Sequence, residues 1–165
     1  MKKTAIAIGV LFSFVLVSFV YAADKLAYVD LSRTFTEYTK TKEYEKVLEE
    51  KQKVYETERD KRINELKQLD EKLKLLNDKE KEAKKLEMET KYKDLQEFDR
   101  QKQADLRKDS LEKEKEVLKA IEETVKQYSE KEGYTLVFND RVLIYQSKNL
   151  DITDEVIKIL NKDKK

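Results

Sequence analysis

The strongest constraint on the fold is a run of about a hundred residues, Thr34–Glu132, that contains no glycine, proline or cysteine. Lys, Glu, Asp, Leu and Tyr dominate the run, and a segment of mostly good helix formers without helix breakers is expected to be almost continuously helical. Since an α-helix rises about 1.5 Å per residue, half of the run would form a rod roughly 75 Å long. No compact domain of this size needs such a rod, so we expect an elongated protein whose shape is part of its function.

The N-terminus has the three parts of a secretory signal peptide. Met1-Lys2-Lys3 is basic, Ala5–Val20 carries no charge, and Val20 and Ala22 stand at positions −3 and −1 of a cleavage site after Ala22. The uncharged run is shorter than the roughly 20 residues that cross a bilayer. We therefore expect residues 1–22 to be a cleaved signal peptide and the mature chain to lie in the periplasm; an uncleaved membrane anchor is the alternative.

The composition leaves little material for an enzyme. The chain has no His and no Cys, so the commonest general base, the thiolate nucleophile and the commonest soft metal ligands are missing. It also has no Gly-rich phosphate loop and no GxSxG motif. The sequence thus predicts a protein that is not an enzyme and that uses no cofactor and no metal.

The charge balance gives no basis for nucleic-acid binding. The chain carries 36 basic and 35 acidic residues, and cleavage would remove Lys2 and Lys3, so the mature chain would have a net charge of −1. A near-neutral chain lacks the electrostatic attraction that nucleic acids require. We expect no nucleic-acid partner.

Three short apolar segments outside the helical run are typical of β-strands. Leu26–Leu31 precedes the run, whereas Tyr134–Phe138 and Val142–Tyr145 follow it, and all three contain aromatic or β-branched residues. Asn139-Asp140-Arg141 offers turn residues between the last two segments. Residues 23–33 and 133–165 therefore predict a small β-rich body.

Local signals mark the ends of the helices. Thr34–Glu37 fits a capping box, in which Thr and Glu satisfy free backbone N–H groups at a helix start. Gly133, the only glycine left after cleavage, is suited to the left-handed position that ends a helix. Asp151-Ile152-Thr153 precedes a final helix whose first turn is acidic.

Both ends of the helical run meet in the predicted body, so residues 34–132 must fold back as a helical hairpin. Reflecting the sequence about a centre between Glu80 and Lys81 matches apolar residues of the two arms, although a shift by one turn would match several of them as well. The turn is expected within residues 77–84, at Asn77-Asp78. Few apolar residues lie midway along either arm, which predicts a bend there. The matched pairs include Leu66 with Leu95, Leu69 with Tyr92, and Tyr55 with Leu106.

Several apolar residues do not fit the seam between the arms. Leu75 adjoins Leu76, and neighbouring helical residues point about 100° apart. Flexible Leu and Met, with amphipathic Tyr, suit a surface that accepts varied apolar sequences weakly. Ordinary packing between coiled-coil helices is the alternative reading for each residue. The predicted binding residues are Val54, Leu75, Met88 and Tyr92.

The two ends of the mature chain resemble the Skp (OmpH-like) family of periplasmic chaperones. The resemblance rests on Gly133–Phe138, Val142–Tyr145 and Asp151–Ile157, and on Leu26–Asp30 leading into a helix at Ser32–Phe35. It implies a mainly α (α+β) homotrimer, in which a β-rich trimerisation body carries three long hairpins, like tentacles, around a cavity. It also implies ATP-independent holding of unfolded outer-membrane proteins. The residues expected to build the body are Tyr28, Val29, Val137, Phe138, Leu143 and Tyr145.

One feature departs from the family. Its members are strongly basic, whereas this mature chain is near neutral, so we transfer no lipopolysaccharide-binding residues. Lys79, Lys81, Lys84 and Lys85 gather at the predicted turn but alternate with glutamates, a pattern more typical of a solvated face than of a site for anionic lipid. Weak lipid contact at the turn and a structural role as a coiled-coil envelope spacer are the alternative functions.

Overall fold

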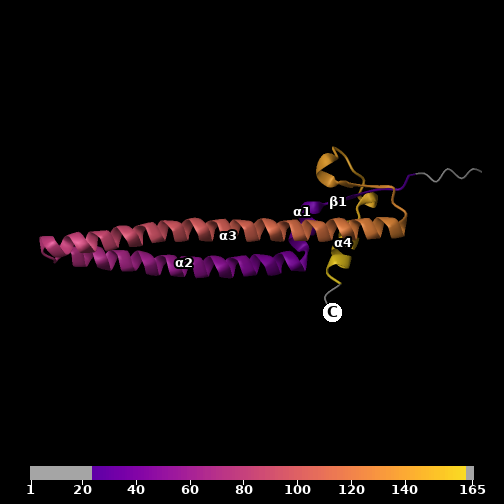
Figure 1. The fold of residues 1–165 in the computed structure, drawn as a ribbon. Helices are drawn as coiled ribbons and strands as arrows, with labels where there is room; N and C mark the ends of the chain where they lie inside the picture. The colour runs from indigo at the N-terminus through magenta and orange to yellow at the C-terminus, as the bar shows by residue number, and fades with distance from the viewer. Residues whose placement is uncertain (1–23, 163–165) are drawn as a thin grey trace, which may run out of the picture.

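The computed structural model describes residues 24–162, so the predicted signal peptide lies outside the described residues. A long helical hairpin projects from a small body that contains both ends of the described chain (Figure 1). This arrangement confirms the predicted mainly α fold with a hairpin and a small β region. The elements in order are β1 (Leu26–Val29), α1 (Leu31–Glu37), α2 (Thr39–Lys74), α3 (Asp78–Glu132), β2 (Leu136–Asn139), the short 3₁₀ helices η1 (Asp140–Val142) and η2 (Lys148–Leu150), and α4 (Thr153–Leu160).

The hairpin consists of α2, with 36 residues, and α3, with 55. Its turn occupies Leu75–Asn77, where the Asn77 side chain accepts a hydrogen bond of 3.1 Å from the Glu80 N–H and caps α3. The turn thus lies at the N-terminal edge of the predicted segment 77–84. The other residues of that segment, rich in Lys and Glu, belong to α3.

The contacts between the arms lie near the predicted register. Lys51 pairs with Asp109 and the Tyr44 hydroxyl donates to Glu116, and both pairs are within one residue of the predicted reflection. Tyr55, paired by the reflection with Leu106, donates a 3.1 Å hydrogen bond to Asp99 and lies 5.8 Å from the Phe98 ring. Because the apolar pattern repeats every turn, the exact register stays a prediction.

The entry into the hairpin also differs from the prediction. Helix α1 begins at Leu31, where the Asp30 side chain accepts from the Arg33 N–H at 2.8 Å. Thr34, expected to start the helix as a cap, is fully buried inside α1, and its hydroxyl donates to the Asp30 carbonyl. The capping-box assignment is therefore wrong, because Asp30 caps the helix one turn earlier. The chain then breaks at Tyr38, whose backbone is extended, before α2 begins.

The sheet of the body is small. Strands β1 and β2 run parallel, with Leu26 opposite Leu136. The other edge of β1 meets the segment before α4, where the Ile152 N–H donates to the Tyr28 carbonyl at 3.0 Å. The predicted strand Val142–Tyr145 is wrong: Asn139 caps η1 and turns the chain away after β2.

Helix α3 connects the hairpin to the body. It begins directly after the turn, and near its other end Val117 and Ile121 are almost completely buried. Both pack in the core of the body, whose other buried members are Ala27, Val29, Ile152, Val156 and Leu160. The helix ends at Gly133, whose φ of 74° confirms the predicted left-handed position. No helix within residues 24–162 is long and apolar enough to span a membrane.

Truncating the core at Ile121 should destabilise the body. Ile121→Ala removes a fully buried side chain and is expected to cost about 2–5 kcal/mol of unfolding free energy. The measurement is urea unfolding followed by circular dichroism. Leu118→Ala, on the same helix but 37% exposed, is the control and should cost less. Equal effects of the two substitutions would contradict the placement of the core.

Candidate functional site

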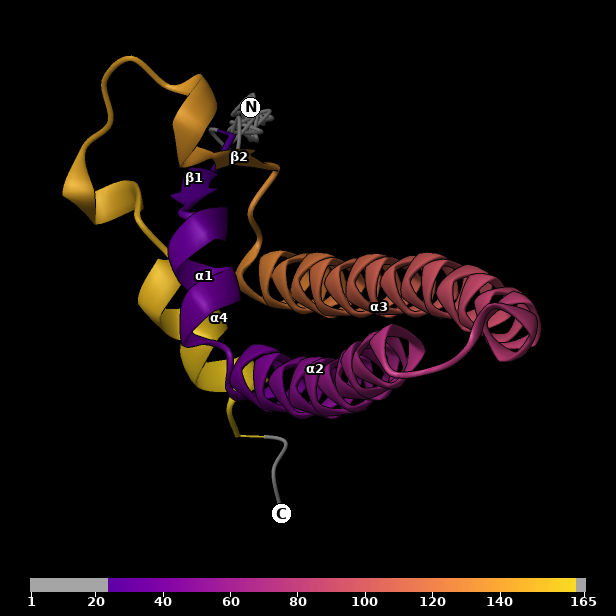
Figure 2. The same cartoon turned by 90° about the vertical axis from the view of Figure 1, so that its left-hand side faces the viewer.

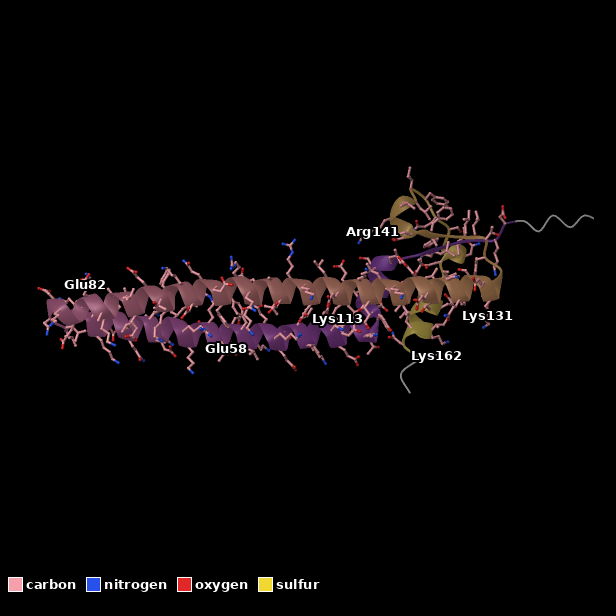
Figure 3. The ribbon with its side chains drawn as sticks, viewed as in Figure 1. Glu58, Glu82, Lys113, Lys131, Arg141 and Lys162 are labelled. Carbon is pink, nitrogen blue, oxygen red and sulfur yellow. The ribbon has the colours of Figure 1, made fainter. Side chains whose placement is uncertain are left out.

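The hairpin surface is predominantly charged. Figure 3 shows polar side chains along both helices, from Glu82 near the turn to Lys113 near the body. Ion pairs also link the two arms, as between Lys91 and Glu65 at 3.1 Å. These polar contacts add to the apolar seam, in which Tyr55, Leu69, Leu73 and Leu95 are buried.

At the base of the hairpin, Glu116 of α3 accepts hydrogen bonds from three side chains. Its carboxylate accepts from the Lys40 ammonium at 2.7 Å and from the Tyr44 hydroxyl at 2.6 Å, both on α2, and from Lys113 at 3.1 Å. These hydrogen bonds, from Lys40 first and then Tyr44 and Lys113, lower the pKa of Glu116 to about 2. The cluster fixes the arms to each other close to the body.

A second polar cluster holds the middle of the hairpin. Tyr55 is buried, and its hydroxyl donates a hydrogen bond to Asp99, which also accepts from Arg59 at 3.1 Å. The Arg62 guanidinium lies 4.3 Å from the centre of the Phe98 ring, within cation–π range. Both helices run uninterrupted through this region, and the bend expected there stays a prediction.

Two grooves with apolar floors open between the arms. The groove nearer the turn has a volume of about 720 Å³; Leu66, Met88 and Tyr92 lie among its lining residues, together with charged side chains of both signs. The second, of about 650 Å³, includes Val47, Val54, Tyr55 and Leu106. An extended apolar segment could contact either floor while the long charged side chains stay hydrated at the rims.

The predicted binding residues fall into three places. Met88 and Tyr92 share the groove nearer the turn, Val54 lines the second groove, and Leu75 lies on the turn, 87% exposed. The prediction did not include Leu66, Val47 or Leu106. The sequence assigned Leu66 and Leu106 to the seam, whereas the structure places them among the lining residues of the grooves.

Some of the residues predicted to build the body are buried within the chain, and others are exposed. Tyr28 and Val29 are buried within the chain itself, and Val137 packs against its core. Phe138 and Tyr145 are exposed, and Leu143 is half-buried. Exposed apolar residues that the prediction omitted surround them: Leu136, Val142, Ile144 and Leu150.

Acidic residues are abundant, but no group of three or more potential ligands within residues 24–162 could hold a metal ion. The arrangement offers apolar contact surfaces on a charged scaffold.

The fold and these surfaces define a class of protein: a long helical hairpin, with apolar grooves, on a small mixed α/β body. A family model described as outer membrane protein (OmpH-like) matches residues 25–160. The chain therefore belongs to the OmpH-like family, which confirms the resemblance seen in the sequence.

A solved structure shares the fold. The matching protein, from Caulobacter crescentus CB15, is described as an OmpH-like outer membrane chaperone; the two chains superpose with a TM-score of 0.78 over 86% of each, at 13% sequence identity. No curated protein matches the sequence.

The Glu116 cluster predicts a pH dependence. Because folding lowers the pKa of Glu116 to about 2, its contribution to stability is present above the unfolded pKa of about 4.3 and is lost as the pH falls towards 2. Carboxyl NMR should show a titration midpoint near 2 for this residue. In Glu116→Gln, urea unfolding should depend less on pH across this window than in the wild type.

Glu112→Gln provides the matched control. The Glu112 carboxylate meets only Lys108, at 3.9 Å, so this variant should follow the wild-type pH profile. A midpoint near 4.3 for Glu116 would contradict the cluster.

Proposed function

We propose that the protein is an ATP-independent holdase chaperone of the periplasm that keeps unfolded outer-membrane proteins from aggregating. Three copies of the chain would form a homotrimer, with the client held between the hairpins. The observation that carries this proposal is the exposure of apolar side chains, in grooves and at the turn, on a hairpin that is otherwise charged. Membership of the OmpH-like family and the description of the Caulobacter relative as a chaperone support it.

The grooves favour weak binding at several points. Each is open, and each combines a few apolar side chains with charges of both signs, so it has little selectivity for any one sequence. Several weak contacts on one hairpin, repeated on three hairpins, raise the overall affinity through effective concentration. A client bound in this way would remain unfolded and could leave without an energy source.

The exposed side of the body supports assembly. Within residues 24–162, strand β2 pairs with β1 on one edge only, and an unpaired edge strand is a template for another chain. Ile144 and Tyr145 are almost fully exposed close to it in sequence, as is much of Val142. Contiguous exposed apolar residues of this kind mark protein interfaces.

The periplasmic address rests on the predicted signal peptide, residues 1–22, with cleavage after Ala22. The alternative function at the turn, contact with anionic lipid, has less support. Lys84 pairs with Glu87 at 2.5 Å and Lys81 lies 3.9 Å from Asp78, so part of the positive charge there is already compensated.

Removing the apolar side chains should weaken client holding. A variant with Ser at Val54, Leu75, Met88 and Tyr92 loses apolar contact at both grooves and the turn, and we expect its affinity for an unfolded outer-membrane protein to fall by about tenfold or more. The measurement is suppression of client aggregation on dilution from urea, with the dissociation constant from fluorescence anisotropy.

The control carries four Ser substitutions at exposed polar positions, which leave the net charge unchanged: Glu82, Lys85, Gln101 and Gln127. It should hold the client as the wild type does. Equal affinities of the two variants would remove the assignment of the binding residues.

Placing a charge on the exposed loop of the body should disrupt assembly. Ile144→Glu would bury a carboxylate in the proposed interface, which is costly without a partner, so sedimentation should show a shift from trimer to monomer. Lys148→Glu, at an exposed polar position nearby, is the control and should leave the trimer intact. A trimer that survives Ile144→Glu would place the interface elsewhere.

A further inference from the structure

The two arms of the hairpin enter the body differently. Helix α3 runs without interruption from the turn into the core of the body, whereas the N-terminal arm breaks at Tyr38, between α1 and α2. Figure 2, which looks along the hairpin, shows α1 and α2 meeting at this break beside α4. The break contains no Gly or Pro, the residues that most often interrupt a helix.

A helix break leaves unpaired backbone groups on both sides, and Tyr38 supplies no side-chain cap for α2. Asn161, at the end of α4, satisfies both sides. Its Oδ1 accepts from the Thr39 N–H at 2.8 Å and from the Thr39 hydroxyl at 2.7 Å, at the start of α2. Its Nδ2 donates to the Glu37 carbonyl at 3.2 Å, at the end of α1.

Helix α4 holds Asn161 in place because it lies alongside α1 and is joined to it at both ends. At the start, the buried Thr153 hydroxyl accepts from the Asp30 N–H at 2.9 Å, and Asp154 pairs with Arg33 at 2.5 Å. Val156 and Leu160 bury the length of α4 in the core. Asn161 itself donates its N–H back to the Ile157 carbonyl at 3.0 Å.

We propose that Asn161 locks the break between α1 and α2 and thereby fixes the direction in which α2 leaves the body to run along α3. It is a positioning residue: it reaches from the C-terminal helix, 122 positions along the chain from Thr39. The lock follows from contacts within one chain and does not rest on the proposed function. If the grooves bind clients, the lock also positions α2, which forms one side of them.

Two readouts test the lock in the full mature chain. The first is amide hydrogen exchange at Thr39, whose N–H has Asn161 as its partner. Asn161→Leu keeps the branch at Cγ but removes all three contacts, and exchange should accelerate by about tenfold. In Asn161→Asp, a carboxylate still accepts from Thr39, so slow exchange should be restored.

The second readout is the position of α2 relative to the body end of α3. Because the chain has no Cys, spin labels can be attached selectively at Glu58→Cys on α2 and Lys131→Cys at the body end of α3, with labelled chains diluted into unlabelled ones. The distance distribution should be narrow with Asn161 and about twofold broader with Asn161→Leu.

Asn64→Leu, at an exposed position on α2, is the matched control and should leave both readouts unchanged. Thr39→Val is a milder variant that tests the lock if Asn161→Leu fails to fold. It removes only the hydroxyl contact and should broaden the distance distribution to a smaller extent. Either of two results would overturn the lock. One is exchange at Thr39 in Asn161→Leu that is as slow as in the wild type. The other is a distance distribution as narrow as that of the wild type in both Asn161→Leu and Thr39→Val.

Discussion

Two helices that project alone into solvent have only one seam in which to bury apolar surface, and here Tyr55, Leu69, Leu73 and Leu95 are buried along it. At the base, Val117 and Ile121 fasten α3 in the core of the body, and the Glu116 cluster fastens α2 to α3 just beyond it. Away from the base, this short apolar seam is supplemented by the Tyr55–Asp99–Arg59 contacts and by ion pairs between the arms. Exposed pairs of this kind contribute little stability each, so the hairpin is firm at the base and weakly held further out.

The same arrangement explains why apolar side chains stay available. A hairpin with a continuous apolar seam would bury Leu66, Met88 and Tyr92 between its arms. Here these side chains line an open groove instead, and Tyr92 is exposed. A surface that binds unfolded polypeptide needs such exposed apolar groups, and the surrounding charges keep the protein soluble.

How far the sequence predicts the structure depends on the range of the interactions. The hairpin follows from a long run without helix breakers whose two ends lie in the same body. Gly133 can be recognised as the end of α3 because a left-handed backbone conformation favours glycine. The register of the two arms cannot be read from the sequence in this way, since the apolar pattern recurs every turn. The break at Tyr38 carries no local signal, because Asn161 stabilises it from the far end of the chain. Val142–Tyr145 has the composition of a strand, yet Asn139 turns it out of the sheet. For the binding residues, the sequence indicates which apolar side chains leave the seam, but the grooves also include Leu66 and Leu106, which the sequence assigned to the seam.

The most direct test of the account is site-specific photo-crosslinking of an unfolded outer-membrane protein to the hairpin. A photoreactive amino acid would replace Tyr92 in the groove in one variant and Gln127, exposed at the body end of α3, in another. The account predicts efficient crosslinks from position 92, few from position 127, and none once the client has folded. Equal crosslinking from the two positions, or crosslinks that persist with folded client, would contradict the claim that the grooves hold unfolded chains.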